Sequence, residues 1–114
     1  MGKLVFHIFH DDEASLGTGS HVAERVRQVK AERGIDIEVY VFGPAEKKLL
    51  DPKAADFNQT IDGLIAAGVQ VKTCLNTAKG LGAADAFAER GIQLEFAREA
   101  FARYAAEGAT VISF

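Results

Sequence analysis

The chemistry that this sequence offers gathers around Cys74, the one cysteine of the chain. The stretch 69–82 (VQVKTCLNTAKGLG) predicts a short strand that ends at Cys74, a turn through Asn76 and Thr77, and then the start of a helix. Open α/β sheets bind ligands beyond the carboxyl ends of their strands, and the partial positive charge of a helix N-terminus favours a thiolate over a thiol. We therefore interpret Cys74 as a candidate nucleophile, with Asn76 and Thr77 as ligands of its anion.

The alternative for Cys74 is a small core residue, because free cysteines are among the most buried residues of proteins. Its position at the end of a predicted strand, and not in the middle, favours the reactive interpretation. Lys72 and Lys79 lie close in the sequence, and a facing ammonium group would lower the pKa of the thiol.

Two histidines are the candidate partners of the thiolate. His7 lies within the predicted first strand and His10 at its end, and either would serve as a base or a hydrogen-bond partner in a cysteine–histidine pair. The alternative for His7 is a histidine whose nitrogens are satisfied inside the core. Residues three apart in a regular strand point to opposite faces, so their spacing leaves open which one approaches Cys74. Both are kept as candidate ligand-binding residues.

Metal and phosphate sites are not expected. The side chains of metal-binding type in the first part of the chain are His7, His10, Asp11, Asp12, Glu13 and His21. Their spacing matches no zinc or iron motif, so a solvated acidic loop is expected and no metal. Gly17-Thr18-Gly19 lacks the full glycine pattern of a nucleotide-binding loop, so it is interpreted as a turn into a helix. No cofactor is expected.

Length and composition bound the class of protein. The chain has 114 residues, of which 48% are apolar and 25% charged, which suits one soluble domain spanning 1–114. A net charge of −3 argues against nucleic acid or an anionic membrane as partner, and no stretch approaches the roughly 20 apolar residues of a membrane helix. A single cysteine excludes an internal disulfide and fits a reducing compartment. We expect a cytoplasmic protein.

Five predicted strands alternate with helices along the chain. The strands are expected at 3–9, 35–42, 69–74, 92–96 and 109–114, and the helices at 20–33 (capped by Ser20), 52–67 (capped by Asp51), 76–90 (split near Gly80 and Gly82) and 98–107 (packing through Phe101, Tyr104 and Ala105), with a loop at 10–19 and a helical turn at 45–50. This alternation with short connections predicts an α/β fold, with a mainly parallel sheet covered on both faces.

Three segments resemble a known family. They are the first strand with Phe6-His7-Ile8 and the acidic loop Asp11-Asp12-Glu13, the second strand running into Gly43 (EVYVFG), and the third strand ending in Cys74-Leu75-Asn76-Thr77. Together with the order and lengths of the elements, they make the chain similar over nearly its whole length to the DsrE/DsrF-like family of small α/β proteins. The sulfur-relay subunits DsrE and TusD belong to this family. The resemblance is closest to its small stand-alone members.

The resemblance implies a three-layer α/β/α fold with a five-stranded sheet, and homotrimers, homohexamers or heterohexamers. In the relay subunits a cysteine after the third strand carries sulfur as a persulfide, and here only Cys74 occupies that position. The implied partners are further copies of the chain and a protein that donates or accepts sulfur. Phe114, at the end of an apolar run, adds surface that an oligomer would bury.

Three functions follow as expectations. The first is a sulfur carrier or sulfurtransferase-like protein that holds sulfane sulfur as a persulfide on Cys74. The second is a non-catalytic oligomeric module that binds a small ligand or a partner near the same sheet edge. The third is a redox-sensing thiol, which would need a disulfide to another molecule because the chain has no second cysteine.

Overall fold

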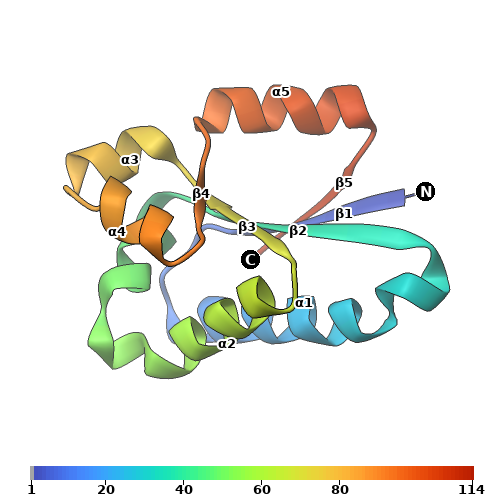
Figure 1. The fold of residues 1–114 in the computed structure, drawn as a ribbon, viewed down its shortest axis with the longest axis horizontal. Coiled ribbons are helices and arrows are strands. Elements are labelled where there is room, and N and C mark those ends of the chain that lie inside the picture. Colours follow the sequence, from blue (N-terminus) through green and yellow to red (C-terminus); the bar gives the residue numbers. More distant parts are fainter. Residues whose placement is uncertain (1) are drawn as a thin grey trace.

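Five parallel strands form one sheet, in the order β4-β3-β2-β1-β5 (Figure 1). The computed structural model describes residues 2–114. The strands are β1 (Gly2–Ile8), β2 (Ile35–Val41), β3 (Gln70–Thr73), β4 (Gln93–Leu94) and β5 (Thr110–Ser113); the helices are α1 (Glu13–Arg33), α2 (Ala55–Ala66), α3 (Leu75–Gly80), α4 (Ala84–Glu89) and α5 (Ala97–Glu107), with 3-10 segments η1 (Gly43–Leu50) and η2 (Pro52–Ala54). The expected α/β fold with a parallel five-stranded sheet is confirmed.

The two faces of the sheet are covered unequally. On one face α1 and α2 pack over a large core that includes Phe6, Val39 and Ile61, and α3 and α4 add to it at one end. On the other face α5 lies alone over a smaller cluster that includes Tyr40 and Tyr104 (Figure 1). The result is three layers, α/β/α, with a thin outer layer on the side of α5. No helix among residues 2–114 is long and apolar enough to cross a membrane.

Helix α1 starts earlier than predicted. Asp12 caps it, because its carboxylate accepts the Ser15 N–H at 3.0 Å. The predicted cap, Ser20, lies inside the helix and donates its hydroxyl to the Leu16 carbonyl at 2.7 Å. The predicted loop at 10–19 is therefore wrong from residue 13 onward, and Gly17 and Gly19 are helical. Gly19 is small for a packing reason, since an added Cβ would lie 3.0 Å from the Ile8 side chain.

Other boundaries follow the predictions more closely. Asp51 caps η2, with Pro52 at its first position, and the predicted break near Gly80 and Gly82 separates α3 from α4. For α5, Tyr104 packs on the sheet as expected. Phe101 also packs there, with its ring centre 5.5 Å from that of His7 and 5.7 Å from that of Phe42, although 42% of the residue stays exposed. Ala105 is exposed too. The helix presents Ala100, and not Ala105, to the sheet beside Tyr104.

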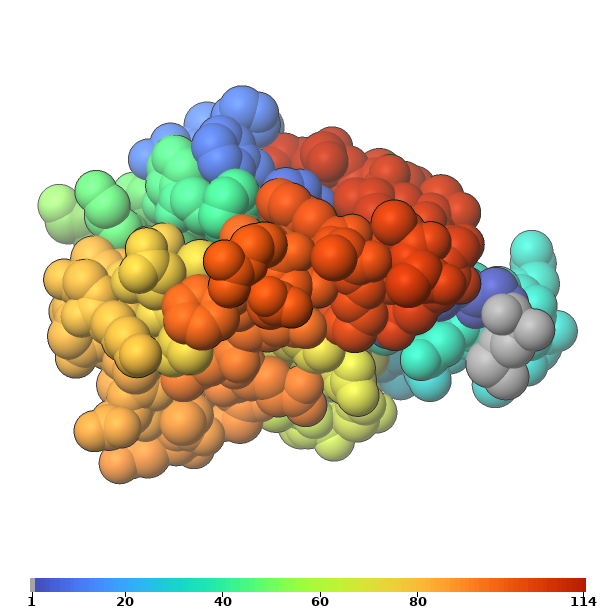
Figure 2. Space-filling view, turned by 90° about the horizontal axis from the view of Figure 1, so that it is seen from above, coloured from blue at the N-terminus to red at the C-terminus, as the bar shows by residue number. Residues whose placement is uncertain are grey.

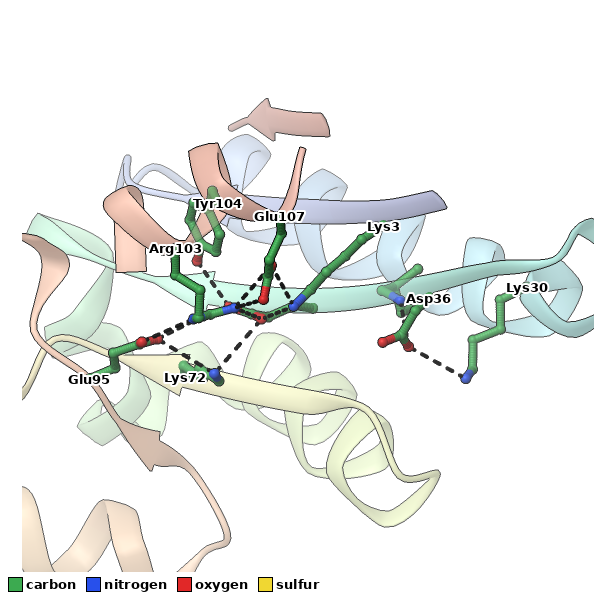
Figure 3. Close-up of polar contacts among 10 residues, drawn as sticks. Lys3, Lys30, Asp36, Lys72, Glu95, Arg103, Tyr104 and Glu107 are labelled. Atoms are coloured by element: carbon green, nitrogen blue, oxygen red, sulfur yellow. Dashed lines mark hydrogen bonds and ion pairs between the residues drawn. The ribbon is translucent and has the colours of Figure 1, made fainter. Parts of the chain in front are cut away.

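A network of ion pairs ties α5 to the sheet at the centre of its face (Figure 3). Glu38 of β2 is fully buried. Arg103 of α5 binds both of its carboxylate oxygens, at 3.1 and 2.8 Å, and the Lys3 ammonium lies at 2.9 Å. Burial alone would raise the pKa of Glu38, but these hydrogen bonds and the nearby Lys72 charge hold it below its usual value. The carboxylate is therefore ionised and fully paired.

The same network reaches the end of β4. Arg103 also binds both carboxylate oxygens of Glu95, at 3.0 and 2.7 Å, and Lys72 lies 3.5 Å from Glu95. Glu95 stands at the start of the connection from β4 to α5. The network therefore fixes this connection, as well as α5, against the middle of the sheet.

Candidate functional site

Cys74 lies where neighbouring strands send the chain to opposite faces of the sheet. After β3 the chain turns into α3 and α4, whose residues Ala78 and Phe87 belong to the core under α1 and α2. After β4, the neighbour of β3, it turns into α5 on the other face. Such a divergence of connections beyond the carboxyl ends of parallel strands is where α/β sheets bind ligands. In the view of Figure 2, α3 lies beside the segment that leads into α5.

The sulfur of Cys74 is enclosed by main-chain donors from both connections. Cys74 is the N-cap of α3, in an extended backbone conformation and without a side-chain capping hydrogen bond. The main-chain N–H groups of Thr77, Ala97 and Asn76 lie near its sulfur and favour its ionised form. The Thr77 side chain lies near the sulfur as well. Burial opposes ionisation, but these donors together hold the pKa of the Cys74 thiol below its usual range. The residue is 5% exposed.

The predicted part of this arrangement is the contribution of Asn76 and Thr77, which the structure does place at the sulfur. The two lysines behave differently from the expectation. Lys72 extends toward carboxylates, 3.8 Å from Glu38 and 3.5 Å from Glu95, and the Lys79 ammonium lies 6.0 Å from the centre of the Phe96 ring. Main-chain dipoles, and not lysine charges, therefore stabilise the thiolate.

Tyr40 of β2 forms the floor of the site. Its hydroxyl donates to the Glu95 carbonyl at 2.9 Å and also lies within hydrogen-bonding reach of Cys74. Burial, followed by the negative charges of Cys74 and Glu46, raises the pKa of Tyr40 far above its usual value, so the hydroxyl stays a neutral donor. Together with the hydrogen bond from the Glu95 N–H to the Thr73 carbonyl at 3.0 Å, Tyr40 holds the β4–α5 connection beside the sulfur.

Glu46 of η1 lies on the other side of Cys74 and is fully buried. Its Oε1 accepts the main-chain N–H of Cys74 at 3.3 Å, whereas its Oε2 has no hydrogen-bond partner. Burial raises the pKa of Glu46 to about 7, and contacts with Thr73 and the Cys74 N–H offset only part of this effect. We refer to Cys74, Tyr40, Glu46, Thr77 and Ala97 as the sulfur site.

The raised pKa of Glu46 makes folding stability fall as the pH rises. The folded protein keeps the Glu46 proton up to about pH 7, whereas the unfolded chain releases it near the ordinary value of 4.5. The free energy of unfolding therefore decreases between these values and is flat above them. In urea denaturation, Glu46→Gln should gain about 3 kcal/mol over wild type between about pH 4 and about pH 8. A constant difference between the two proteins would contradict this assignment.

The two predicted histidines lie in different places. His7 pairs in register with Tyr40 and lies on the same face, with ring centres 6.0 Å apart. Its Nδ1 lies 3.5 Å from the Ser113 hydroxyl, and its Nε2 is buried without a partner. Burial lowers the pKa of His7, so it is neutral at pH 7. Strand β2 separates it from Cys74, so it lines the same face but does not complete the sulfur site.

His10 lies outside β1 and is exposed, with its ring against Phe9. It therefore does not reach Cys74. Strand β1 ends at Ile8, so His10 is not held at the edge of the sheet. The acidic residues beside it also have local roles, since Asp12 caps α1. Within residues 2–114, no group of three or more His, Cys, Asp or Glu side chains could hold a metal ion.

A hollow of about 430 Å³ lies away from the sulfur site, between the starts of α1 and α2. Its lining includes the acidic residues Asp11, Glu13 and Asp56, and also Lys48 and Lys53. Asp51 lines it too, and its carboxylate pairs with Lys48 at 3.4 Å.

Sequence reasoning missed three members of the sulfur site, namely Tyr40, Glu46 and Ala97. In the sequence, nothing distinguishes Tyr40 from the apolar residues of a buried strand. Glu46 follows a Gly-Pro break, where a glutamate is ordinarily solvated, and it lies 28 positions from Cys74. Ala97 contributes only its main chain. The one available signal was topological, because parallel strands bring all three following loops to one edge of the sheet.

Comparison with known proteins supports the fold and goes no further. No family model and no curated protein matches this chain. Among solved structures, the ychN protein from E. coli is similar with a TM-score of 0.78 and 21% identity, over 100% of both chains. The protein of unknown function MTH1491 from Methanobacterium thermoautotrophicum is similar with a TM-score of 0.76 and 23% identity, also over 100% of both chains.

A third structure, the conserved protein of unknown function BT1422 from Bacteroides thetaiotaomicron, is similar with a TM-score of 0.77 and 16% identity, covering 98% of this chain and 94% of that one. At such low identities the likeness concerns the arrangement of the elements along the whole chain. The chain therefore shares its complete fold with these three proteins.

Proposed function

We propose that this protein is a sulfur carrier that holds sulfane sulfur as a persulfide on Cys74. The observation that supports the proposal is the convergence of main-chain N–H groups from two separate connections, those of Asn76, Thr77 and Ala97, on one sulfur. Such donors stabilise an anion without a counter-ion. They serve a thiolate before sulfur transfer and a persulfide anion after it.

The loading step conserves atoms and charge. The Cys74 thiolate attacks the terminal sulfur of a hydropersulfide donor, R–S–SH, and its electron pair forms the new S–S bond. The old S–S bond breaks, and its electron pair leaves on the donor as R–S⁻. This leaving thiolate takes the proton of the transferred sulfur, so the products are R–SH and the ionised Cys74 persulfide. The attacking thiolate must be available near neutral pH, which is what a lowered thiol pKa provides.

The direct test is the intact mass of wild-type protein after incubation with a sulfane-sulfur donor such as an inorganic polysulfide. We expect an increase of one sulfur atom per chain that is reversed by a thiol reductant, and peptide mapping should place it on Cys74. A thiol that reacts only after unfolding would contradict the proposal. It would favour the alternative of a binding module without sulfur chemistry.

We also propose that the protein acts as a homo-oligomer in the cytoplasm, a trimer or a hexamer, that exchanges sulfur with a donor or acceptor protein. The reason that the sequence offered, Phe114, does not support this, because its ring stacks on Phe6 within the same chain at 6.3 Å. Edge strand β5 is the better support. All four of its residues are exposed, including Val111 (42%) and Ile112 (43%), and exposed apolar edges tend to be covered by a partner.

The β5 surface makes a testable prediction. Ile112→Asp should shift the sedimentation coefficient at micromolar concentration from that of an oligomer to that of a monomer, since a buried unpaired carboxylate opposes association. Asp85→Asn, on the exposed side of α4, should leave the coefficient unchanged. A wild-type protein that sediments as a monomer would contradict the proposed oligomer.

A further inference from the structure

Glu46 is a buried carboxyl group that the loading step does not use. It is 0% exposed, and one of its oxygens accepts the main-chain N–H of Cys74 at 3.3 Å. The other oxygen is buried without a partner. A carboxylate in such a position has lost its hydration and recovers one hydrogen bond in return, which is costly for the charged form. Its contact with the candidate nucleophile suggests a role there.

Glu46 lies close to Cys74 and has no cationic partner. Tyr40 and Cys74 belong to one buried cluster, and the buried Glu46 carboxyl accepts the main-chain N–H of Cys74 at 3.3 Å, so both acidic groups lie in one buried space. No lysine, arginine or histidine among residues 2–114 forms an ion pair with Glu46. Two anions in this space would repel each other with little screening. The site therefore disfavours having Cys74 and Glu46 ionised together.

Thr73 supplies no donor to the second oxygen of Glu46. Its side chain lies near the Glu46 carboxyl, but its hydroxyl donates to the Val41 carbonyl at 2.7 Å, and Oε2 of Glu46 has no hydrogen-bond partner. An ionised Glu46 therefore keeps a buried oxygen without a donor, which favours the neutral carboxyl.

We propose that Glu46 is the proton-holding partner of Cys74: around neutral pH its carboxyl is neutral when the sulfur is an anion, and it ionises when the sulfur is a neutral thiol. The inference rests on the proposed role of Cys74 as the sulfur-carrying residue. The pair then holds one proton near pH 7 and titrates as a unit, with two macroscopic steps that belong to both residues.

This pairing keeps the charge of the site constant during sulfur loading. The site starts with a Cys74 thiolate and a protonated Glu46, and it ends with a Cys74 persulfide anion and the same protonated Glu46. The leaving thiolate receives its proton from the transferred sulfur, so the proton of Glu46 is not consumed. A neutral Glu46 also leaves the main-chain donors of Thr77 and Ala97 as the dominant field on the sulfur.

The test is a pH titration of the thiolate ultraviolet absorbance, which needs no reagent to reach the buried sulfur. Because Cys74 is the one cysteine, subtracting the signal of Cys74→Ser isolates it. Wild type should titrate in two steps, whereas Glu46→Gln should titrate in one step whose midpoint lies about one pH unit below the upper step of wild type. Asp51→Asn, which deletes a carboxylate directly after η1, the segment that contains Glu46, should keep the wild-type titration curve. A wild-type curve in Glu46→Gln, or the same shift in Asp51→Asn, would overturn the inference.

A reciprocal measurement covers the case in which Glu46→Gln does not fold. Coupling between two sites acts equally in both directions, so Cys74→Ser should lower the titration midpoint of Glu46 by the same amount. The C=O stretch of the protonated carboxyl, followed by infrared spectroscopy against pH, reports this midpoint. An unchanged midpoint in Cys74→Ser would overturn the coupling.

These titrations separate the two proposals, because neither requires a sulfur donor. A coupled pair in a protein that does not load sulfur would leave the proton pairing in place and remove the carrier function. Normal sulfur loading in a protein whose Cys74 and Glu46 titrate independently would keep the carrier function and remove the proton pairing.

Discussion

Replacing Cys74 by serine is expected to abolish sulfur loading and to leave the fold intact. The chain has no other cysteine, so no second thiol can take over. A serine at this N-cap position keeps an acceptor near the N–H groups of Asn76 and Thr77, and serine is among the preferred N-cap residues. The free energy of unfolding should therefore change by no more than about 1 kcal/mol. Intact mass after donor treatment and urea denaturation measure the two halves of this expectation.

Thr77→Val is the matched comparison, because it removes the side-chain hydroxyl near the sulfur and keeps the main-chain N–H groups. It should slow sulfur loading and raise the thiol pKa without abolishing either thiolate or persulfide. Sulfur uptake by Cys74→Ser that equals that of wild type would end the carrier hypothesis for this residue.

Replacing Glu38 by alanine is expected to cause the largest loss of stability among the substitutions considered. Lys3, Lys72 and Arg103 all approach the fully buried Glu38 carboxylate, and Tyr104 donates to it at 3.0 Å. Removing it leaves buried or half-buried cations, and a tyrosine hydroxyl, without their acceptor. Breaking a buried ion pair from one side typically costs about 3–5 kcal/mol, and urea denaturation at neutral pH measures this loss.

The control is Glu24→Ala on α1. Glu24 also forms a two-pronged pair with an arginine, Arg27, at 2.8 and 2.6 Å. Its side chain is 27% exposed, however, and exposed pairs contribute less than about 1 kcal/mol. If Glu38→Ala lowered the free energy of unfolding by no more than Glu24→Ala, the network would contribute as little as an exposed ion pair and would not fix α5 on the sheet.

The strands show which part of the fold could be predicted from the sequence. The run from Lys3 to Phe9 is almost continuously apolar, which predicts a central parallel strand, and β1 is such a strand. Helix starts were harder to place, because Asp12 and Ser20 are both good caps. The choice between them depends on Ile8 packing against Gly19, a contact that no local pattern contains.

The sulfur site shows the same division. The position of Cys74 at a strand end, and the donors that follow it within three residues, are local and could be predicted. Tyr40, Glu46 and Ala97 reach the sulfur from elsewhere in the chain. Their contribution depends on strand order, which alternation of strands and helices does not determine. His10 was wrongly placed for a related reason, since the strand ends two residues before it.

The strand order has a consequence for how the protein folds. Strands β1 to β4 are laid side by side in the order of synthesis, but β5 returns to the first strand, where Leu4 pairs with Thr110. Pairing between strands that lie far apart in the sequence is slow, because the chain between them must close, at a cost in entropy, before the stabilising contacts form. Ala97 and Arg103 arrive with this same returning unit. Until it docks, Cys74 lacks its third main-chain donor, so a growing chain carries a less acidic thiol. The proposed reactivity of Cys74 would therefore require the complete fold.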